Sequence, residues 1–188
     1  YAEGSVVAIS ASPATGWHFS NWTGSVANPN SSSTTVTMDA DKTVTATFAQ
    51  DQYTLTINIV GQGSVTKLPD QATYTYSSSV QLTAVPQSGW SFSSWSGDLS
   101  GSTIPTTITM NGNRTVTATF TQSTHILTMS VSGNGSTTPA VGSYSYAEGT
   151  VVSISATPST GWHFSTWSSN VADPGSPSTT VNVAADKT

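Results

Sequence analysis

The sequence predicts an all-β protein built as a tandem array of small modules of about 72 residues. One seven-residue phrase with two tryptophans occurs three times, as GWHFSNW, GWSFSSW and GWHFSTW. The first tryptophans of successive phrases lie 73 and then 72 residues apart. The surrounding segments are apolar at every second residue, which is the pattern of a half-buried strand. No segment shows the 3.6-residue period of a helix.

The phrases around each tryptophan pair recur in one order and divide the chain into three repeats. We place repeat 1 at 1–52, repeat 2 at 53–124 and repeat 3 at 125–188. Residues 1–43 align without a gap with residues 146–188, with 29 of 43 positions identical, whereas repeat 2 differs more and suggests two alternating repeat types. Repeat 1 lacks the first segment of the pattern, and repeat 3 stops at DKT and lacks the last one, VTATF. We therefore expect both to be completed in the native assembly, by continuation of a longer polypeptide or by strands of a neighbouring subunit.

Repeat 2 contains the full set of predicted strands. Residues 53–60 and 80–85 alternate between apolar and polar side chains, as half-buried strands do. Residues 106–110 and 114–120 alternate in the same way and flank Asn111-Gly112, the strongest short signal for a hairpin. We therefore expect these two strands to pair through a turn that needs positive φ.

The tryptophan phrases are predicted to form the cores of the repeats. A module of about 70 residues buries a modest core and depends on large side chains to fill it. The glycine before the first tryptophan permits a tight turn that directs the indole inward. The strongest alternative is that exposed aromatic pairs stack on sugar rings, but fixed spacing beside a fixed phenylalanine favours core. The predicted core residues are Trp17, Phe19, Trp22, Trp90, Phe92, Trp95, Trp162, Phe164 and Trp167.

The composition excludes several classes of partner. Charged residues make up only 7% of the chain and the net charge is −5, so no basic surface is available for nucleic acid. No apolar run reaches the roughly 18 residues of a membrane span. The chain has no cysteine and is rich in Ser and Thr. This combination favours a location outside the cell or at the cell surface, without disulfides or thiolate metal sites.

No group of residues matches a catalytic or cofactor-binding pattern. His18 and His163 recur in two repeats, but repeat 2 has Ser91 at that place, and His125 stands alone. None of these histidines has the spacing of a metal-binding motif. No nucleophile elbow of the form G-x-S-x-G occurs. We predict no enzymatic activity, no catalytic or metal residues and no cofactor.

The acidic residues fit turns and loops better than a calcium site. Asp and Asn favour turns because they bond to nearby backbone. Calcium, the alternative, takes about six to eight oxygen ligands, and no EF-hand-type loop is present. Lys42 and Lys187 occupy exposed turn positions, which argues against isopeptide bonds. The acidic residues considered are Asp39, Asp41, Asp98, Asp173 and Asp186.

Four asparagines carry the N-x-Ser/Thr pattern of N-glycosylation. They are Asn21, Asn30, Asn113 and Asn134. Asn30 and Asn134 lie in a predicted loop and turn, where modification is favoured. Asn21 lies between two core tryptophans, where it is disfavoured.

The order G-W-x-F-x-x-W, then T-V-T-M-x-A-D-K-T-V-T-A-T-F, resembles the divergent internalin B-repeat family, also called Listeria–Bacteroides-type repeats. The resemblance covers essentially the whole chain, although repeat 2 has MNGNRT where repeat 1 has MDADKT. It implies small β-rich modules, often compared with the β-grasp fold, strung in tandem in secreted or surface-attached bacterial and archaeal proteins. It implies no shared catalytic residues.

These observations favour an extracellular structural protein, a segment of a stalk, sheath or filament built from stacked β modules. Its main partner is then the protein itself, through neighbouring repeats or subunits. One alternative is an adhesin that binds glycans or cell-surface proteins through its variable loops or tryptophan pairs. Another is a set of accessory repeats of a secreted hydrolase. The variable loops, residues 23–33, 96–105 and 168–178, contain no aromatic residues beyond the tryptophan phrase, which favours the structural role.

Overall fold

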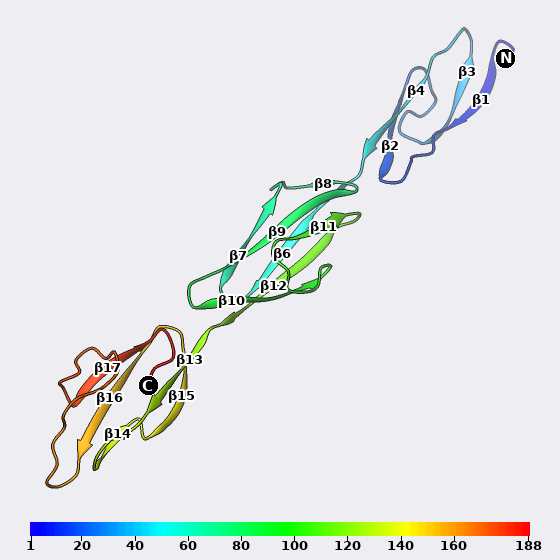
Figure 1. Cartoon of the computed structure of the whole chain (residues 1–188). Coiled ribbons are helices and arrows are strands. Elements are labelled where there is room, and N and C mark those ends of the chain that lie inside the picture. Colours follow the sequence, from blue (N-terminus) through cyan, green and yellow to red (C-terminus); the bar gives the residue numbers. More distant parts are fainter. The chain divides into compact units, whose positions relative to one another are not determined.

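The computed structural model describes all 188 residues and consists of strands joined by turns and loops, without a helix (Figure 1). The predicted all-β class is therefore confirmed, and the β-grasp comparison extends only to the strands. No helix is available to cross a membrane. The chain forms two compact units, whose division passes through repeat 2. The first unit comprises Tyr1–Asn58, Val65–Thr83 and Trp95–Thr117, and the second comprises Ile59–Ser64, Ala84–Ser94 and Ala118–Thr188.

Repeat 1 consists of two small antiparallel sheets. Strand β1 pairs with β3, with Val7 opposite Val36, and β2 pairs with β4, with Trp22 opposite Ala46. A bulge interrupts β2 after Phe19. Only Trp22 and Val36 of this repeat are buried hydrophobic residues. The strands are β1 (Ser5–Ser10), β2 (Trp17–Thr23), β3 (Ser33–Met38) and β4 (Thr45–Gln50).

Repeat 2 has two sheets of three strands each, in the orders β10-β12-β6 and β11-β9-β7, and a short pair β5-β8. Alternate residues of the strands turn inward, so that Val116, Ala118 and Phe120 of β12 are at most 2% exposed. This alternation is the period of two that the sequence displays. The strands are β5 (Gln52–Tyr53), β6 (Leu55–Val60), β7 (Gly63–Leu68), β8 (Tyr74–Thr75), β9 (Ser78–Pro86), β10 (Trp90–Gly97), β11 (Thr106–Met110) and β12 (Arg114–Gln122).

The predicted hairpin at Asn111-Gly112 is wrong. Strands β11 and β12 belong to different sheets, and Gly112 does not have a positive φ. The cause is a competing set of hydrogen bonds to the first strand of the repeat. The backbone N–H of Thr54 donates to Asn113 Oδ1 at 3.0 Å, and the N–H of Arg114 donates to the Thr54 carbonyl at 2.9 Å. These bonds hold the start of β12 beside β6. The turn residues therefore connect two different sheets and do not close a hairpin.

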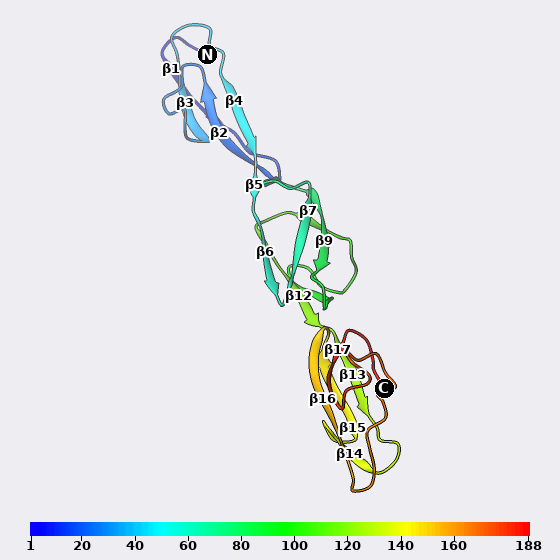
Figure 2. The same cartoon turned by 90° about the vertical axis from the view of Figure 1, so that its left-hand side faces the viewer.

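Repeat 3 places a two-stranded sheet, β13-β15, against a three-stranded sheet, β14-β16-β17 (Figure 2). Its buried core comes from both sheets: Leu127, Met129, Val152, Ile154, Val181 and Val183. Tyr144, Tyr146, Trp167 and Val171 pack against this core. The strands are β13 (Thr124–Met129), β14 (Gly135–Thr138), β15 (Gly142–Ala147), β16 (Thr150–Pro158) and β17 (Ser178–Val183).

Residues 162–168 repeat the sequence pattern of β2 and β10 but form no strand. In repeats 1 and 2 this segment pairs with the T-V-T-A-T-F strand, β4 or β12. Residues 125–188 contain no counterpart of that strand, and a segment without a ladder partner does not hold a strand conformation. The repeats also differ in the number of buried hydrophobic residues, which is 2 in repeat 1, 11 in repeat 2 and 6 in repeat 3.

We expect local stability to follow this order. Amide hydrogen exchange of the whole chain should be slowest in β9 and β12 and faster in β4 and residues 162–168, because opening free energy scales with buried apolar contact. Mass spectrometry after timed exchange measures this directly. Equal protection of all three repeats would contradict the expectation.

Candidate functional site

The second tryptophan of each phrase fastens the variable loop that follows it. In repeat 1, the indole N–H of Trp22 donates to the Ser31 carbonyl at 2.9 Å, and its backbone N–H donates to the Pro29 carbonyl at 2.8 Å. Trp95 makes the same two bonds to the carbonyls of Thr103 and Gly101, at 3.0 and 2.7 Å.

Repeat 3 repeats this arrangement although its phrase is not a strand. The indole and backbone N–H groups of Trp167 donate to the carbonyls of Ser176 and Pro174, at 2.9 and 3.0 Å. The three loops differ in sequence, but each is held by the same two hydrogen bonds from the second tryptophan of its phrase. We call this shared arrangement the tryptophan-held frame. Trp22 and Trp95 are buried, at 8% and 3% exposure, and the indole N–H remains satisfied, as a buried tryptophan requires.

The first tryptophan of the phrase does not match its expected place in the core. Trp17 is 43% exposed and Trp162 is 56% exposed, whereas Trp90 is half-buried. The preceding turn is present, since Gly16 has φ +77 and the Trp17 N–H donates to the Ala14 carbonyl at 3.0 Å.

The reason for the different exposures lies in the turn between the first two strands. In repeat 2 the indole of Trp90 lies against Gly61, and in repeat 3 that of Trp162 lies against Gly133. No such contact is present at Trp17 within residues 1–52, and residues 162–168 beside Trp162 form no strand. Phe19, Phe92, Phe164 and Trp167 are half-buried.

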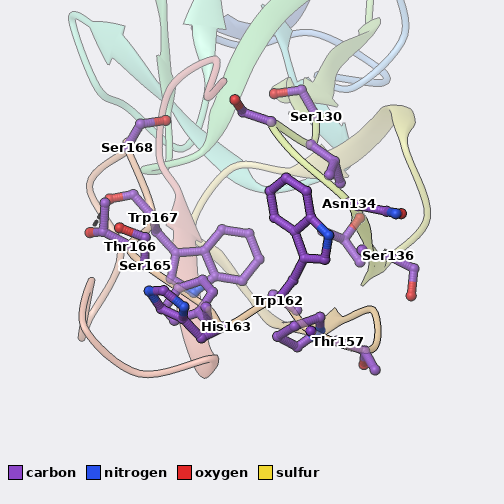
Figure 3. Close-up of a pocket in the computed structure, with 18 residues that line it drawn as sticks. Ser130, Asn134, Ser136, Thr157, Trp162, His163, Ser165, Thr166, Trp167 and Ser168 are labelled. Carbon is purple, nitrogen blue, oxygen red and sulfur yellow. Dashed lines mark hydrogen bonds between the residues drawn. The ribbon is translucent and has the colours of Figure 1, made fainter.

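A cleft of about 760 Å³ opens in repeat 3 between residues 130–137 and 161–168. Figure 3 shows the indoles of Trp162 and Trp167 projecting into it. Val131, Pro158, His163 and Phe164 also line it, together with several Ser and Thr residues. The lining carries no carboxylate, so it offers no acid–base pair for hydrolysis of the kind that glycosidases use.

The histidines lie in three separate surroundings. His18 Nδ1 is 2.8 Å from Asp51 Oδ1, and His163 lines the cleft of repeat 3. His125 has its ring nitrogens 3.7 Å from a Glu148 oxygen and 3.6 Å from an Asp186 oxygen. No group of three or more acidic, histidine or cysteine residues is arranged to hold a metal ion.

The acidic residues serve as local anchors. Asp39 pairs with Lys42, and this hydrogen bond lowers the pKa of the Asp39 carboxyl below its ordinary value. Asp186 Oδ1 accepts the N–H of Ile126 at 2.8 Å, as Asn113 accepts that of Thr54. Turn chemistry alone did not predict this role. The recurrence of Asp or Asn at one place in all three repeats was the available signal. Asp173 Oδ1 accepts the N–H of Gly175 within its loop at 3.0 Å.

Asp98 holds the start of β12. Its carboxylate accepts the backbone N–H of Thr115 at 2.7 Å and a guanidinium N–H of Arg114 at 3.0 Å. The Thr115 bond, with the Arg114 charge beside it, lowers the pKa of Asp98 below its ordinary value. Sequence reasoning placed Asp98 in a variable loop and missed this contact, because the partners come from distant segments.

Asp98→Asn should lower the denaturant midpoint of the chain near neutral pH. A carboxyl whose pKa is depressed on folding stabilises the protein above its unfolded pKa of 3.8, and this contribution is lost as pH falls through the folded value. The difference between the variant and the parent should therefore shrink in acid. Urea unfolding followed by circular dichroism at about pH 7 and about pH 3 measures it. A difference that is the same at both pH values would contradict a charge-based role.

The four sequon asparagines differ in their surroundings. Asn30 is exposed in the first variable loop, and Asn134 Oδ1 accepts the Ser159 hydroxyl at 3.1 Å. Asn113 Oδ1 is used by Thr54, and the amide of the half-buried Asn21 donates to the Trp22 carbonyl at 3.2 Å. Asn30 is thus the sequon that a glycan reaches with the least rearrangement.

Repeats 1 and 2 are joined through a single residue between strands, which we call joint 1. Asp51 alone separates β4 from β5. Its N–H donates to the Gly16 carbonyl of repeat 1 at 2.8 Å, and its carbonyl accepts the N–H of Tyr76 of repeat 2 at 3.0 Å. Burial, with the Asp51 charge nearby, raises the pKa of Tyr53, whose ring lies 6.5 Å from that of Tyr76.

Joint 2, between repeats 2 and 3, repeats these bonds with different side chains. Ser123 alone separates β12 from β13. Its N–H donates to the Gly89 carbonyl at 2.8 Å, and its carbonyl accepts the Glu148 N–H at 2.9 Å. Because these hydrogen bonds join backbone atoms, no pattern of side chains in the sequence predicts them.

Comparison with known families agrees with this architecture. The divergent InlB B-repeat domain matches three times, at residues 1–52, 53–124 and 125–188. Neither a curated protein nor a solved structure matches the chain. Repeats of this family are typical of bacterial surface proteins, and the domains found are not catalytic. The chain belongs to the divergent InlB B-repeat family, as three tandem copies of its domain.

Proposed function

We propose that the chain is an extracellular structural segment, part of a surface stalk, sheath or filament in which the repeats act as stiff spacers. The observation that carries this proposal is the pair of joints. At each joint one residue separates the strands of adjacent repeats and makes one backbone hydrogen bond to either side. Such a connection restricts bending between neighbours, as in other arrays that depend on nearest-neighbour contacts.

The surface of the repeats suits a location outside the cell. Its exposed strand faces carry Thr and Ser in place of charged residues, and the chain has no cysteine to oxidise. Threonine favours a strand and keeps the exposed face polar without charge. Labelling of intact cells of the source organism with antibodies against the repeats tests this location, and signal only after permeabilisation would count against it.

Replacement of the joint residue tests the stiffness. Ser123→Pro removes the N–H that Gly89 accepts at joint 2, and Ser100→Pro, in a variable loop, serves as the matched control. Distances between spin labels in repeats 2 and 3 should be narrowly distributed in the parent and the control and broad in Ser123→Pro. A broad distribution in the parent chain would contradict the spacer function.

Binding through the variable loops is a second candidate function, supported by the tryptophan-held frame. Loops with different sequences on one fixed frame are preorganised, which reduces the entropy lost on binding. Screening of the whole chain against glycans and cell-surface proteins tests this function. A ligand whose binding survives replacement of the loop residues 98–104 by glycine and serine would exclude that loop as its site.

A further inference from the structure

The turn between β11 and β12 contains an Asn-Gly pair that belongs to no strand. Asn111 is exposed and Gly112 is half-buried. The N–H of Gly112 makes no hydrogen bond. A Cβ added at Gly112 would meet no atom within 4 Å, and the φ angle of this residue is not positive. The backbone nitrogen of Gly112 is therefore unbonded, and its surroundings are open.

The guanidinium group of Arg114 lies beside this pair and is only partly satisfied. Its Nη1 donates to Asp98 Oδ1 at 3.0 Å, and its Nη2 donates to Asn111 Oδ1. The Nε–H group of Arg114 is buried and has no partner. Nε and Nη2 form the side of a guanidinium that offers two parallel N–H groups to one carboxylate. An amide has one acceptor oxygen and an NH₂ group that only donates, so Asn111 satisfies half of this fork.

The same place in repeat 1 holds a carboxylate. The turn MNGNR of repeat 2 aligns with MDADK of repeat 1, so that Asn111 corresponds to Asp39 and Arg114 to Lys42. Asp39 pairs with Lys42, which lies three residues further along the chain. The turn therefore accommodates a carboxylate beside its cation, and repeat 2 has an amide there instead.

We propose that Asn111-Gly112 is a site of spontaneous deamidation, which converts Asn111 into the carboxylate that the Arg114 fork lacks. The Gly112 nitrogen loses its proton to solvent and attacks Asn111 Cγ. A bond forms between these two atoms, the bond from Cγ to Nδ2 breaks, and the side-chain nitrogen takes up a proton and leaves as ammonia. Water then opens the succinimide ring. Opening at Cγ gives aspartate, and opening at the backbone carbonyl carbon gives isoaspartate.

The surroundings of the turn favour both the reaction and its product. Gly112 has no Cβ to obstruct the attack of its own nitrogen. The Nη2 group on Asn111 Oδ1 stabilises the negative charge that develops on this oxygen during the attack. The carboxylate of the product can accept from Nε and Nη2 together, and such charge-assisted pairs are stronger than the bonds of a neutral amide. The proposal rests on repeat 2 and does not depend on the mechanical function.

Incubation of the whole chain near neutral pH tests the reaction. Proteolysis in acid, which halts further deamidation, and mass spectrometry then locate each exchange of NH₂ for OH. Asn111 should convert at least as fast as the same residue in the free peptide ITMNGNRT, residues 108–115. Slower conversion in the folded chain than in this peptide would overturn the proposal.

The second Asn-Gly pair of the chain, Asn134-Gly135, is the internal control. Asn134 Oδ1 and its backbone carbonyl both accept hydrogen bonds from Ser159, each at 3.1 Å, and Gly135 belongs to β14. Asn134 should therefore convert more slowly than in its own peptide VSGNGSTT, residues 131–138. Conversion of Asn134 at its peptide rate would mean that the fold does not control deamidation in this chain, and would overturn a role for the surroundings of Asn111.

Two variants test the parts assigned to Gly112 and Arg114. Gly112→Ala should slow conversion by about tenfold, which corresponds to about 1.4 kcal/mol in activation free energy. It should leave the urea midpoint unchanged, because the added methyl group meets no atom. Arg114→Gln should also slow conversion, because the charge developing on Oδ1 loses its donor. Conversion at the parent rate in either variant would overturn the part assigned to that residue.

Asn111→Asp reproduces the aspartate product and tests the fork. It should raise the ratio of folded to unfolded chain about tenfold over the freshly purified parent, as a hydrogen bond between charged groups does. In the Arg114→Gln background this gain should vanish, as a double-mutant cycle by urea unfolding measures. No gain in Asn111→Asp, or an equal gain without Arg114, would overturn the fork as the destination of the new carboxylate.

Discussion

Trp95→Ala should lower the free energy of unfolding of repeat 2 by about 3–5 kcal/mol, as truncation of buried tryptophans does. Trp95 is 3% exposed, and its indole N–H holds the Thr103 carbonyl. The substitution therefore removes a large apolar surface and frees the variable loop. A repeat of this size has a total stability of only several kcal/mol, so most of it should be unfolded.

Trp17→Ala is the control, because it changes the same residue type at the exposed position of the phrase. It should cost about 1 kcal/mol or less, as surface substitutions usually do. Amide exchange of the whole chain measures each repeat separately and does not depend on tryptophan fluorescence, which all six indoles share. If Trp17→Ala destabilises its repeat as much as Trp95→Ala, both indoles of the phrase act as core. Retained exchange protection in Trp95→Ala would contradict the assignment of Trp95 to the core.

Periodicity was enough to predict the fold class and the strands of repeat 2 at 53–60, 80–85, 106–110 and 114–120, but not β7, β8 or β10. The alternation of Val80, Leu82 and Ala84 reflects a geometry in which successive side chains point to opposite faces. These side chains are all buried in β9. The repetition of the phrases adds a second source of information, because a strand recognised in one repeat identifies its counterparts in the others.

The hairpin and the first tryptophans could not be predicted in this way. Asn111-Gly112 is compatible with a hairpin. The hairpin does not form because Thr54, which is distant in sequence, makes hydrogen bonds with Asn113 and Arg114. Trp90 and Trp162 occupy the same place in the phrase G-W-x-F-S-x-W and have different exposures. The difference depends on whether a neighbouring strand is present, which is a tertiary effect.

The joints escaped prediction for a related reason. Asp51 and Ser123 share no side-chain chemistry, yet each makes the same two backbone hydrogen bonds. The only sequence signal was the invariant glycine of the tryptophan phrase, which was assigned to a local turn. The positive φ of Gly16 supports that turn, and the closeness of Tyr76 gives the residue a second role at joint 1.

Gly16→Ala should disrupt joint 1, whereas Gly161→Ala should not affect either joint. Both glycines have positive φ, +77 and +81, so an added methyl group introduces backbone strain of about 1–2 kcal/mol in each. At Gly16 the new Cβ would also collide with the ring of Tyr76, whereas no atom lies within 4 Å of the corresponding Cβ position at Gly161. The collision adds about 1–3 kcal/mol, the usual cost of overpacking.

The readout is the exchange of the two amides at joint 1, those of Asp51 and Tyr76, which donate to Gly16 and Asp51. Gly16→Ala should accelerate both by more than tenfold, because the excess cost over Gly161→Ala exceeds about 1.4 kcal/mol over most of its range. Gly161→Ala should leave them at the parent rate. The ring supplies the clash, so Tyr76→Ala should restore much of the lost protection in the Gly16→Ala background. Exchange of both amides at the parent rate in Gly16→Ala would contradict the contact of Gly16 with Tyr76 as the reason why glycine is needed at this position.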